Sequence, residues 1–79
     1  MDGIRLSGLN VGKEGVILSV DLEQEQKKRL TELGFVPGSR IRVLHKAPGG
    51  SPVAYSIKGT VVALRNHDCT GITVFANDH

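Results

Sequence analysis

Residues 33–38 read LGFVPG, between a charged segment and an alternating apolar and polar stretch at residues 39–47. Gly34 is the residue type expected just after a helix, where a left-handed backbone conformation avoids a Cβ clash. Phe35 or Val36 would fold back on Leu30 as the apolar contact that accompanies such a helix end. Pro37-Gly38 fits the middle of a type II turn. The stretch therefore predicts a rigid corner between a helix and a strand.

The segment before this corner predicts one short amphipathic helix. Asp21 is expected to cap it, and Gln24 three residues later completes a pair similar to a capping box. The helix would begin near Leu22 and end at Gly34. Leu30 and Leu33 would face the core, and the remaining side chains would be solvated.

Five extended segments surround the helix, at residues 15–22, 39–47, 53–59, 60–66 and 71–76. In the first, Val16, Leu18 and Val20 share one face, and Ile17 and Ser19 lie on the other. In the second, residues 41, 43 and 45 oppose a cationic outer face. Short strands with glycine between them favour a closed barrel, because closure removes unpaired edges. The sequence predicts an all-β fold with one helix: a small barrel of about five strands with a helical insertion after the first.

Length and composition predict one domain over residues 1–79. The chain has 79 residues and a single cysteine, Cys69, so it forms no internal disulfide and fits a reducing compartment. No apolar run approaches the roughly 18 residues of a membrane span, and the first residues lack the pattern of a signal peptide. We therefore expect a cytoplasmic protein without direct membrane insertion.

The charge balance gives little support to nucleic-acid binding. The formal net charge is +2, from 10 Lys and Arg against 8 Asp and Glu, and there are three aromatic residues to stack on bases. We predict no nucleic-acid partner. A small-barrel nucleic-acid binder remains an alternative that salt-dependent retention on DNA or RNA would support.

The order of elements resembles the FeoA family, small cytoplasmic partners of the bacterial ferrous-iron transporter FeoB. The resemblance runs from LSGLNVGKEGVILSV (residues 6–20) through RLTELGFVPGSRIRVLHKAPGGSPVAYSIKGTVVALR (residues 29–65). Its most specific part is the helix end, the corner and the KAPGGSP loop at residues 46–52. It implies an SH3-like barrel. The chain departs from the family at residues 66–72, NHDCTGI, where Cys69 stands at a position usually occupied by alanine.

Neither a metal centre nor a catalytic site is predicted. His67 and Cys69 are weak candidates for metal ligands, and His45 or the terminal Asp78 and His79 would have to complete a set. We expect Cys69 to be a core residue and His67 to be a solvated turn residue. No nucleophile motif, acidic pair or phosphate-binding glycine loop is present. We therefore predict a protein that is not an enzyme and has no cofactor, with weak or adventitious divalent metal as the alternative.

A protein partner is the predicted ligand. The resemblance implies docking on the cytoplasmic GTPase region of FeoB, and we place the contact on the exposed corner, the loop and the cationic strand face. The residues predicted to contact the partner are Phe35, Val36, Arg40, Arg42, Lys46, Pro48, Gly49, Gly50, Ser51 and Pro52. Lys58 and Arg65 could adjoin the cationic face. Solvated charge and an ordinary hairpin connector are the structural alternatives for these groups.

Two further points stay open from the sequence. The second functional hypothesis is an SH3-like module related to the C-terminal domain of metal-dependent transcriptional repressors, with a role in metal-linked regulation. Self-association through a barrel edge, giving a homo-oligomer, is neither required nor excluded by any motif.

Overall fold

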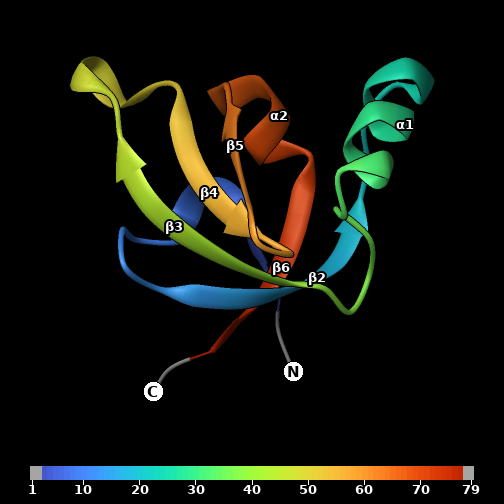
Figure 1. The fold of residues 1–79 in the computed structure, drawn as a ribbon, viewed down its shortest axis with the longest axis horizontal. Helices are drawn as coiled ribbons and strands as arrows, with labels where there is room; N and C mark the ends of the chain where they lie inside the picture. Colours follow the sequence, from blue (N-terminus) through green and yellow to red (C-terminus); the bar gives the residue numbers. More distant parts are fainter. Residues whose placement is uncertain (1–2, 78–79) are drawn as a thin grey trace.

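The computed structural model describes residues 3–77 and consists of one antiparallel sheet with short helical segments (Figure 1). The strands are β1 (Ile4–Arg5), β2 (Glu14–Val20), β3 (Arg40–Lys46), β4 (Val53–Ile57), β5 (Thr60–Leu64) and β6 (Ile72–Asn77). The helical segments are α1 (Gln24–Glu32), α2 (Asn66–Thr70) and the 3-10 turns η1 (Leu6–Gly8) and η2 (Pro48–Gly50). No helix within residues 3–77 is long and apolar enough to cross a membrane.

The sheet curls around one core in the strand order β1-β6-β2-β3-β4-β5. Its edge strands β1 and β5 are not paired with each other in the part of the chain described. η1 follows β1, α2 follows β5, and these two segments pack against each other, so they bridge the opening between the two edges. The predicted barrel with a helical insertion is confirmed. Among the elements, the sequence did not predict the two-residue strand β1, the 3-10 turn η2 and the five-residue helix α2.

The corner has the geometry that the sequence predicted. The Phe35 amide donates to the Leu30 carbonyl at 2.9 Å and the Gly34 amide to the Thr31 carbonyl at 3.0 Å, which is the hydrogen-bond pair of a Schellman helix end. Gly34 has φ +107°. Gly38 has φ +93°, and the Ser39 amide donates to the Val36 carbonyl at 3.0 Å, as in a type II turn.

The start of α1 differs from the prediction. α1 begins at Gln24, Glu23 occupies the N-cap position, and no side chain caps the helix. The Asp21 amide instead donates to the Gly71 carbonyl at 2.7 Å. A Cβ on Gly71 would lie 2.5 Å from the Asp21 carbonyl oxygen, so the two segments pass too closely for a larger residue. This contact holds Asp21 against the barrel, and Leu22 packs against the core instead of beginning the helix.

A β-bulge changes the faces of β2. The register against β6 shifts between Ile17 and Ser19, so Ile17 and Val20 both point inward, although they are three residues apart. Leu18 is 45% exposed. The prediction that Val16, Leu18 and Val20 share a face is therefore wrong, because a bulge interrupts the two-residue alternation.

A second bulge has the same effect in β3. The register against β4 shifts between Val43 and His45. Ile41 and Val43 are buried as predicted, whereas His45 is exposed instead of continuing their face.

The core is a single cluster drawn from β2 to β6 and from the helical segments. Its fully buried large side chains are Tyr55, Phe35, Leu6, Ile17, Leu30, Ile41, Ile57, Leu64, Ile72, Val43, Val74 and Cys69. Leu6 in η1 is fully buried in this cluster. Leu30 is the one buried residue of α1, so most of this helix stands beside the barrel rather than in it (Figure 1).

Candidate functional site

The corner is rigid, but it offers less surface than predicted. The Gly38 amide donates to the Ile17 carbonyl at 2.8 Å, and the Ile17 amide donates to the Ser39 carbonyl at 2.9 Å, so the turn is tied to β2 at its bulge. Phe35 is 1% exposed. The expectation that Phe35 is exposed is wrong, because the Schellman end turns its side chain into the core. Val36 is half-buried.

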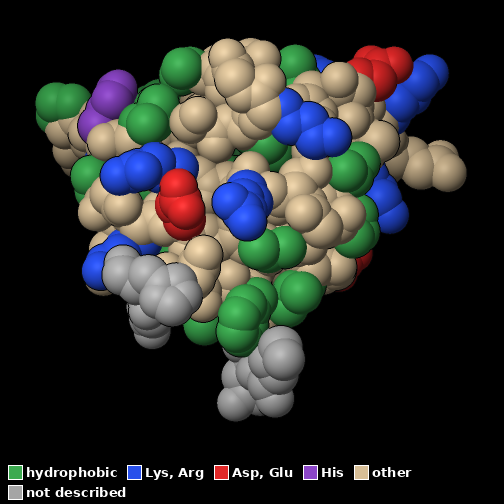
Figure 2. All heavy atoms as spheres, turned by 60° about the horizontal axis from the view of Figure 1, so that its bottom comes forward, with side chains coloured by type: hydrophobic (Ala, Val, Ile, Leu, Met, Phe, Trp, Pro, Cys, Tyr) green, Lys and Arg blue, Asp and Glu red, His purple; other side chains and the backbone are tan. Residues whose placement is uncertain are grey.

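The outer face of β3 carries the predicted cations. Arg40, Arg42 and Lys46 are exposed. An Arg42 guanidinium nitrogen lies 3.5 Å from a Glu14 carboxylate oxygen on β2, and both side chains remain largely in solvent. Such a pair stabilises a fold by about 1 kcal/mol at most. Figure 2 shows Lys and Arg side chains at separate places on this side of the molecule, rather than one continuous basic patch.

The loop after β3 is held by its own backbone. The Ala47 amide donates to the Pro52 carbonyl at 3.0 Å, and the Gly50 amide donates to the Ala47 carbonyl at 2.8 Å. Gly49 and Gly50 have φ +86° and +92°, and no heavy atom lies within 4 Å of where their Cβ atoms would be. The apex of the loop is therefore ordered and unobstructed. Its predicted contact residues Pro48, Gly49 and Pro52 are exposed.

The structure does not gather the predicted contact residues into one compact patch. The corner precedes β3 and the loop follows it, so they lie at opposite ends of a seven-residue strand (Figure 1). At about 3.3 Å per residue the two are roughly 20 Å apart. A partner that touches both would have to cover most of one face of a molecule whose longest extents are 31 and 30 Å.

The two weak candidates for metal ligands lie on different faces of α2. His67 is exposed, whereas Cys69 is completely buried. Residues two apart on a helix point in different directions, and the predicted turn is in fact such a helix. Within residues 3–77, no three His, Cys, Asp or Glu side chains lie close enough to hold an ion together. The other suggested ligands, Asp78 and His79, lie outside the described residues.

Cys69 instead contacts Tyr55 inside the core. Its Sγ lies 3.1 Å from the Tyr55 hydroxyl oxygen, and both side chains are at most 1% exposed. Burial raises the pKa of the Cys69 thiol, although the Tyr55 hydroxyl partly offsets the effect. Burial, together with the neighbouring thiol, also raises the pKa of the Tyr55 hydroxyl. Both groups are therefore held in their neutral forms.

This pair predicts a loss of stability in alkali. Because both pKa values are higher in the folded than in the unfolded protein, their contribution is complete below the ordinary thiol pKa of 9.0 and is lost as the pH rises above it. Each group contributes a slope of up to about 1.4 kcal/mol per pH unit. Urea unfolding of the protein and of Cys69→Ala, from about pH 7.5 to about pH 10.5, should show a shallower decline for the variant. If the unfolding free energy fell equally with pH in both proteins, the Cys69 thiol would not be a cause of the loss.

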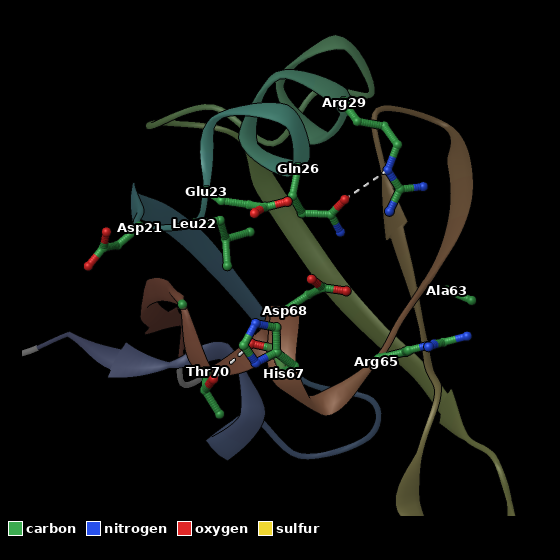
Figure 3. Close-up of a pocket in the computed structure, with 11 residues that line it drawn as sticks. Asp21, Leu22, Glu23, Gln26, Arg29, Ala63, Arg65, His67, Asp68 and Thr70 are labelled. Atoms are coloured by element: carbon green, nitrogen blue, oxygen red, sulfur yellow. Dashed lines mark hydrogen bonds between the residues drawn. The ribbon is translucent and has the colours of Figure 1, made fainter.

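A polar groove lies between α1, β5 and α2. Its volume is about 1150 Å³. One wall is the face of α1 that begins at Glu23 and carries Gln26 and Arg29, and the other is formed by Ala63 and Arg65 at β5 (Figure 3). Residues of α2 form the floor. No sequence pattern predicts this groove, because its walls come together only through the fold.

The comparisons with known proteins identify the family. The model of the FeoA domain matches residues 4–75. The chain belongs to the FeoA domain family. It is 41% identical over 71 residues to an Fe(2+) transport protein A/Fe(2+) transporter FeoB fusion protein of Porphyromonas gingivalis, a match that covers 90% of this chain and 8% of that protein. The chain therefore spans a small part of this relative.

Solved FeoA structures share the fold. A FeoA protein of Chlorobium tepidum has a TM-score of 0.91 and 33% identity, and the match covers 95% of this chain and 71% of that one. Stenotrophomonas maltophilia FeoA, solved in complex with zinc and described as a procaryotic SH3 domain protein, has a TM-score of 0.78 and 33% identity, with coverages of 90% and 88%. These matches confirm the expected SH3-like fold of this FeoA domain.

Metal-dependent repressors contain a similar domain. A manganese-dependent transcriptional repressor has a TM-score of 0.80 at 21% identity, and the match covers 95% of this chain and 42% of the repressor. At that identity the likeness shows a common fold alone. The match therefore supports a shared fold with the repressor domain and gives no support to a role in metal-linked regulation.

Proposed function

We propose that this FeoA-family chain is an accessory protein of ferrous iron uptake that docks on the cytoplasmic GTPase region of an FeoB transporter and carries out no chemistry itself. The observation that carries the proposal is the 41% identity to a protein in which FeoA and FeoB are joined in one chain. Domains fused in one organism commonly act together as separate proteins in another. Ferrous iron is the cargo of the transporter in this proposal and is not bound by this chain.

The docking surface proposed is the outer face of β3 with the loop at its end. Arg40, Arg42 and Lys46 would meet an acidic surface of the GTPase, and the ordered apex of η2 would supply shape. A loop that is already held by hydrogen bonds loses little conformational entropy on binding. Phe35 is excluded from this surface because its side chain is buried, whereas the half-buried Val36 is included.

Biolayer interferometry with the soluble GTPase region of the FeoB transporter from the same organism tests this docking. Reversing both Arg40 and Arg42 to Glu should weaken binding about tenfold or more, since two charge pairs are lost and repulsion replaces them. The matched control reverses Lys27 and Lys28 on α1 to Glu and should change the affinity less than about twofold, because screening is strong beyond about 8 Å at physiological salt. Equal weakening by both pairs would contradict the β3 surface.

The loop is tested in the same experiment with Gly49→Val combined with Gly50→Val. Both positions have positive φ, so valine forces the backbone to rearrange at about 1–3 kcal/mol per residue, while the space around the loop is open. A thermal melt shows whether the barrel is intact. Unchanged affinity in a folded variant would remove the loop from the docking surface. Absence of any binding by the unaltered protein would overturn the docking proposal as a whole.

A further inference from the structure

The outer face of β2 and β6 carries apolar side chains that remain in contact with water. Val16 on β2 is paired in register with Phe75 on β6, and cross-strand partners point to the same side of a sheet. Phe75 is 37% exposed, Leu18 at the β2 bulge is 45% exposed, and Val16 is half-buried. We call Val16, Leu18 and Phe75 the β2–β6 patch.

The close approach of Gly3 shows that Leu18 belongs to this patch. A Cβ on Gly3 would lie 2.9 Å from a Leu18 methyl carbon and 2.6 Å from the Thr73 methyl carbon, so both side chains lie against the Gly3 backbone. Thr73 is two residues before Phe75 on β6, and residues two apart on a regular strand share a face. Leu18 therefore lies beside Thr73 on the face that Phe75 shares.

The β2–β6 patch is continuous with the cationic face of β3. Val16 pairs in register with Arg40 on its other side, so Phe75, Val16 and Arg40 form one row across three adjacent strands. Neighbouring strands are about 4.8 Å apart, which places the backbones of Phe75 and Arg40 about 10 Å apart. Figure 2 shows hydrophobic side chains next to Lys or Arg side chains on this side of the molecule. The patch is thus closer to Arg40 than is the loop η2 at the far end of β3.

The charges around the patch favour an acidic protein surface over a second copy of this chain. On β1, β2, β6 and the first three residues of β3, the charged residues are Arg5, Glu14, Arg40 and Arg42. Three cations face one carboxylate, and that carboxylate is already paired with Arg42. Two copies that met through this face would bring their positive charges together, which opposes association.

The polar side chains within this face favour a protein over a lipid surface. Ser19 is paired in register with Thr73 beside the patch, and Glu14 lies on the same strand. Hydrocarbon offers these groups no hydrogen-bond partner, so insertion of the patch into a bilayer would cost their desolvation free energy. Protein interfaces, in contrast, combine an apolar centre with hydrogen-bonded polar groups and are enriched in arginine.

We propose that the β2–β6 patch is the apolar centre of the surface that contacts FeoB, and that the GTPase region presents apolar side chains next to carboxylates. Arg40 would form charge pairs at the border of this centre, while Leu18 and Phe75 would lose their remaining contact with water. This inference rests on the proposed function and extends the docking surface from β3 onto β2 and β6.

Single serine variants test the patch by biolayer interferometry with the soluble GTPase region of FeoB from the same organism. Leu18→Ser and Phe75→Ser should each weaken binding about fivefold or more, because each removes apolar area that the contact would bury. Val61→Ser is the matched control, since Val61 is 65% exposed but lies on β5, which β3 and β4 separate from β2. It should change the affinity less than about twofold.

NMR of the unaltered ¹⁵N-labelled protein makes the test independent of the stability of any variant. Addition of the unlabelled GTPase region should shift or broaden the amide signals of Val16, Leu18 and Phe75 more than those of η2. Larger effects at η2 than at the patch would contradict the inference. A thermal melt shows whether each serine variant is folded.

Different results would overturn this inference and the proposed function. If reversal of Arg40 and Arg42 weakens binding but Leu18→Ser and Phe75→Ser do not, the apolar centre is wrong and the docking proposal stands. No binding by the unaltered protein would overturn both. A dimer in analytical ultracentrifugation that Leu18→Ser dissociates would assign the patch to a second copy of this chain. Sedimentation with phosphatidylglycerol vesicles that Phe75→Ser abolishes would assign it to a lipid surface.

Discussion

Phe35→Ala should lower the free energy of unfolding by about 3–5 kcal/mol, the usual loss for a fully buried phenylalanine. The ring is 1% exposed and packs in the single core cluster, so alanine would leave a cavity that the tied corner cannot fill by moving. A domain is stable by about 5–15 kcal/mol in total, and the variant should therefore be partly unfolded near physiological temperature. Urea unfolding followed by circular dichroism measures the change.

The neighbouring Val36→Ala is the matched control. Val36 is half-buried in the same turn, and its truncation should lower the free energy of unfolding by about 1 kcal/mol or less. Similar losses of unfolding free energy in both variants would contradict the finding that Phe35 is buried and Val36 only half-buried. The comparison also shows how to interpret a binding defect of a Phe35 variant, which would arise from unfolding rather than from a lost contact.

Leu30→Ala should lower the free energy of unfolding by about 2–5 kcal/mol and detach α1 from the barrel. Leu30 is the one buried side chain of this nine-residue helix, and isolated helices shorter than about 12–15 residues are marginal in water. Once the anchor is gone, the helix should fray. Hydrogen exchange by NMR should show faster exchange of α1 amides than of β4 amides.

Lys28→Ala on the exposed surface of α1 is the control for this variant. It keeps the helix length and should change the free energy of unfolding by less than about 0.5 kcal/mol. If Leu30→Ala kept the exchange protection of α1, the anchoring role of Leu30 would be contradicted.

The sequence of residues 33–38 determined the corner, because the required conformations are local. Gly34 and Gly38 adopt the positive φ values expected of a helix end and a type II turn, and no distant contact is needed to explain them. The buried faces of β5 and β6 were predictable for a similar reason, since regular strands alternate every two residues. The family resemblance was likewise contained in the motif order.

Only the tertiary structure decided the rest. The bulges at Leu18 and Leu44 shift the alternation of β2 and β3 through the pairing with neighbouring strands, which no local pattern encodes. The close approach of Gly71 to Asp21 moved the helix start, although the two residues are fifty positions apart. The groove between α1, β5 and α2 exists only because these distant segments pack together. The wide spacing of the predicted docking residues along β3 is likewise a property of the folded chain. Local backbone conformation depends on neighbouring residues, whereas a binding surface depends on which distant segments the core brings together.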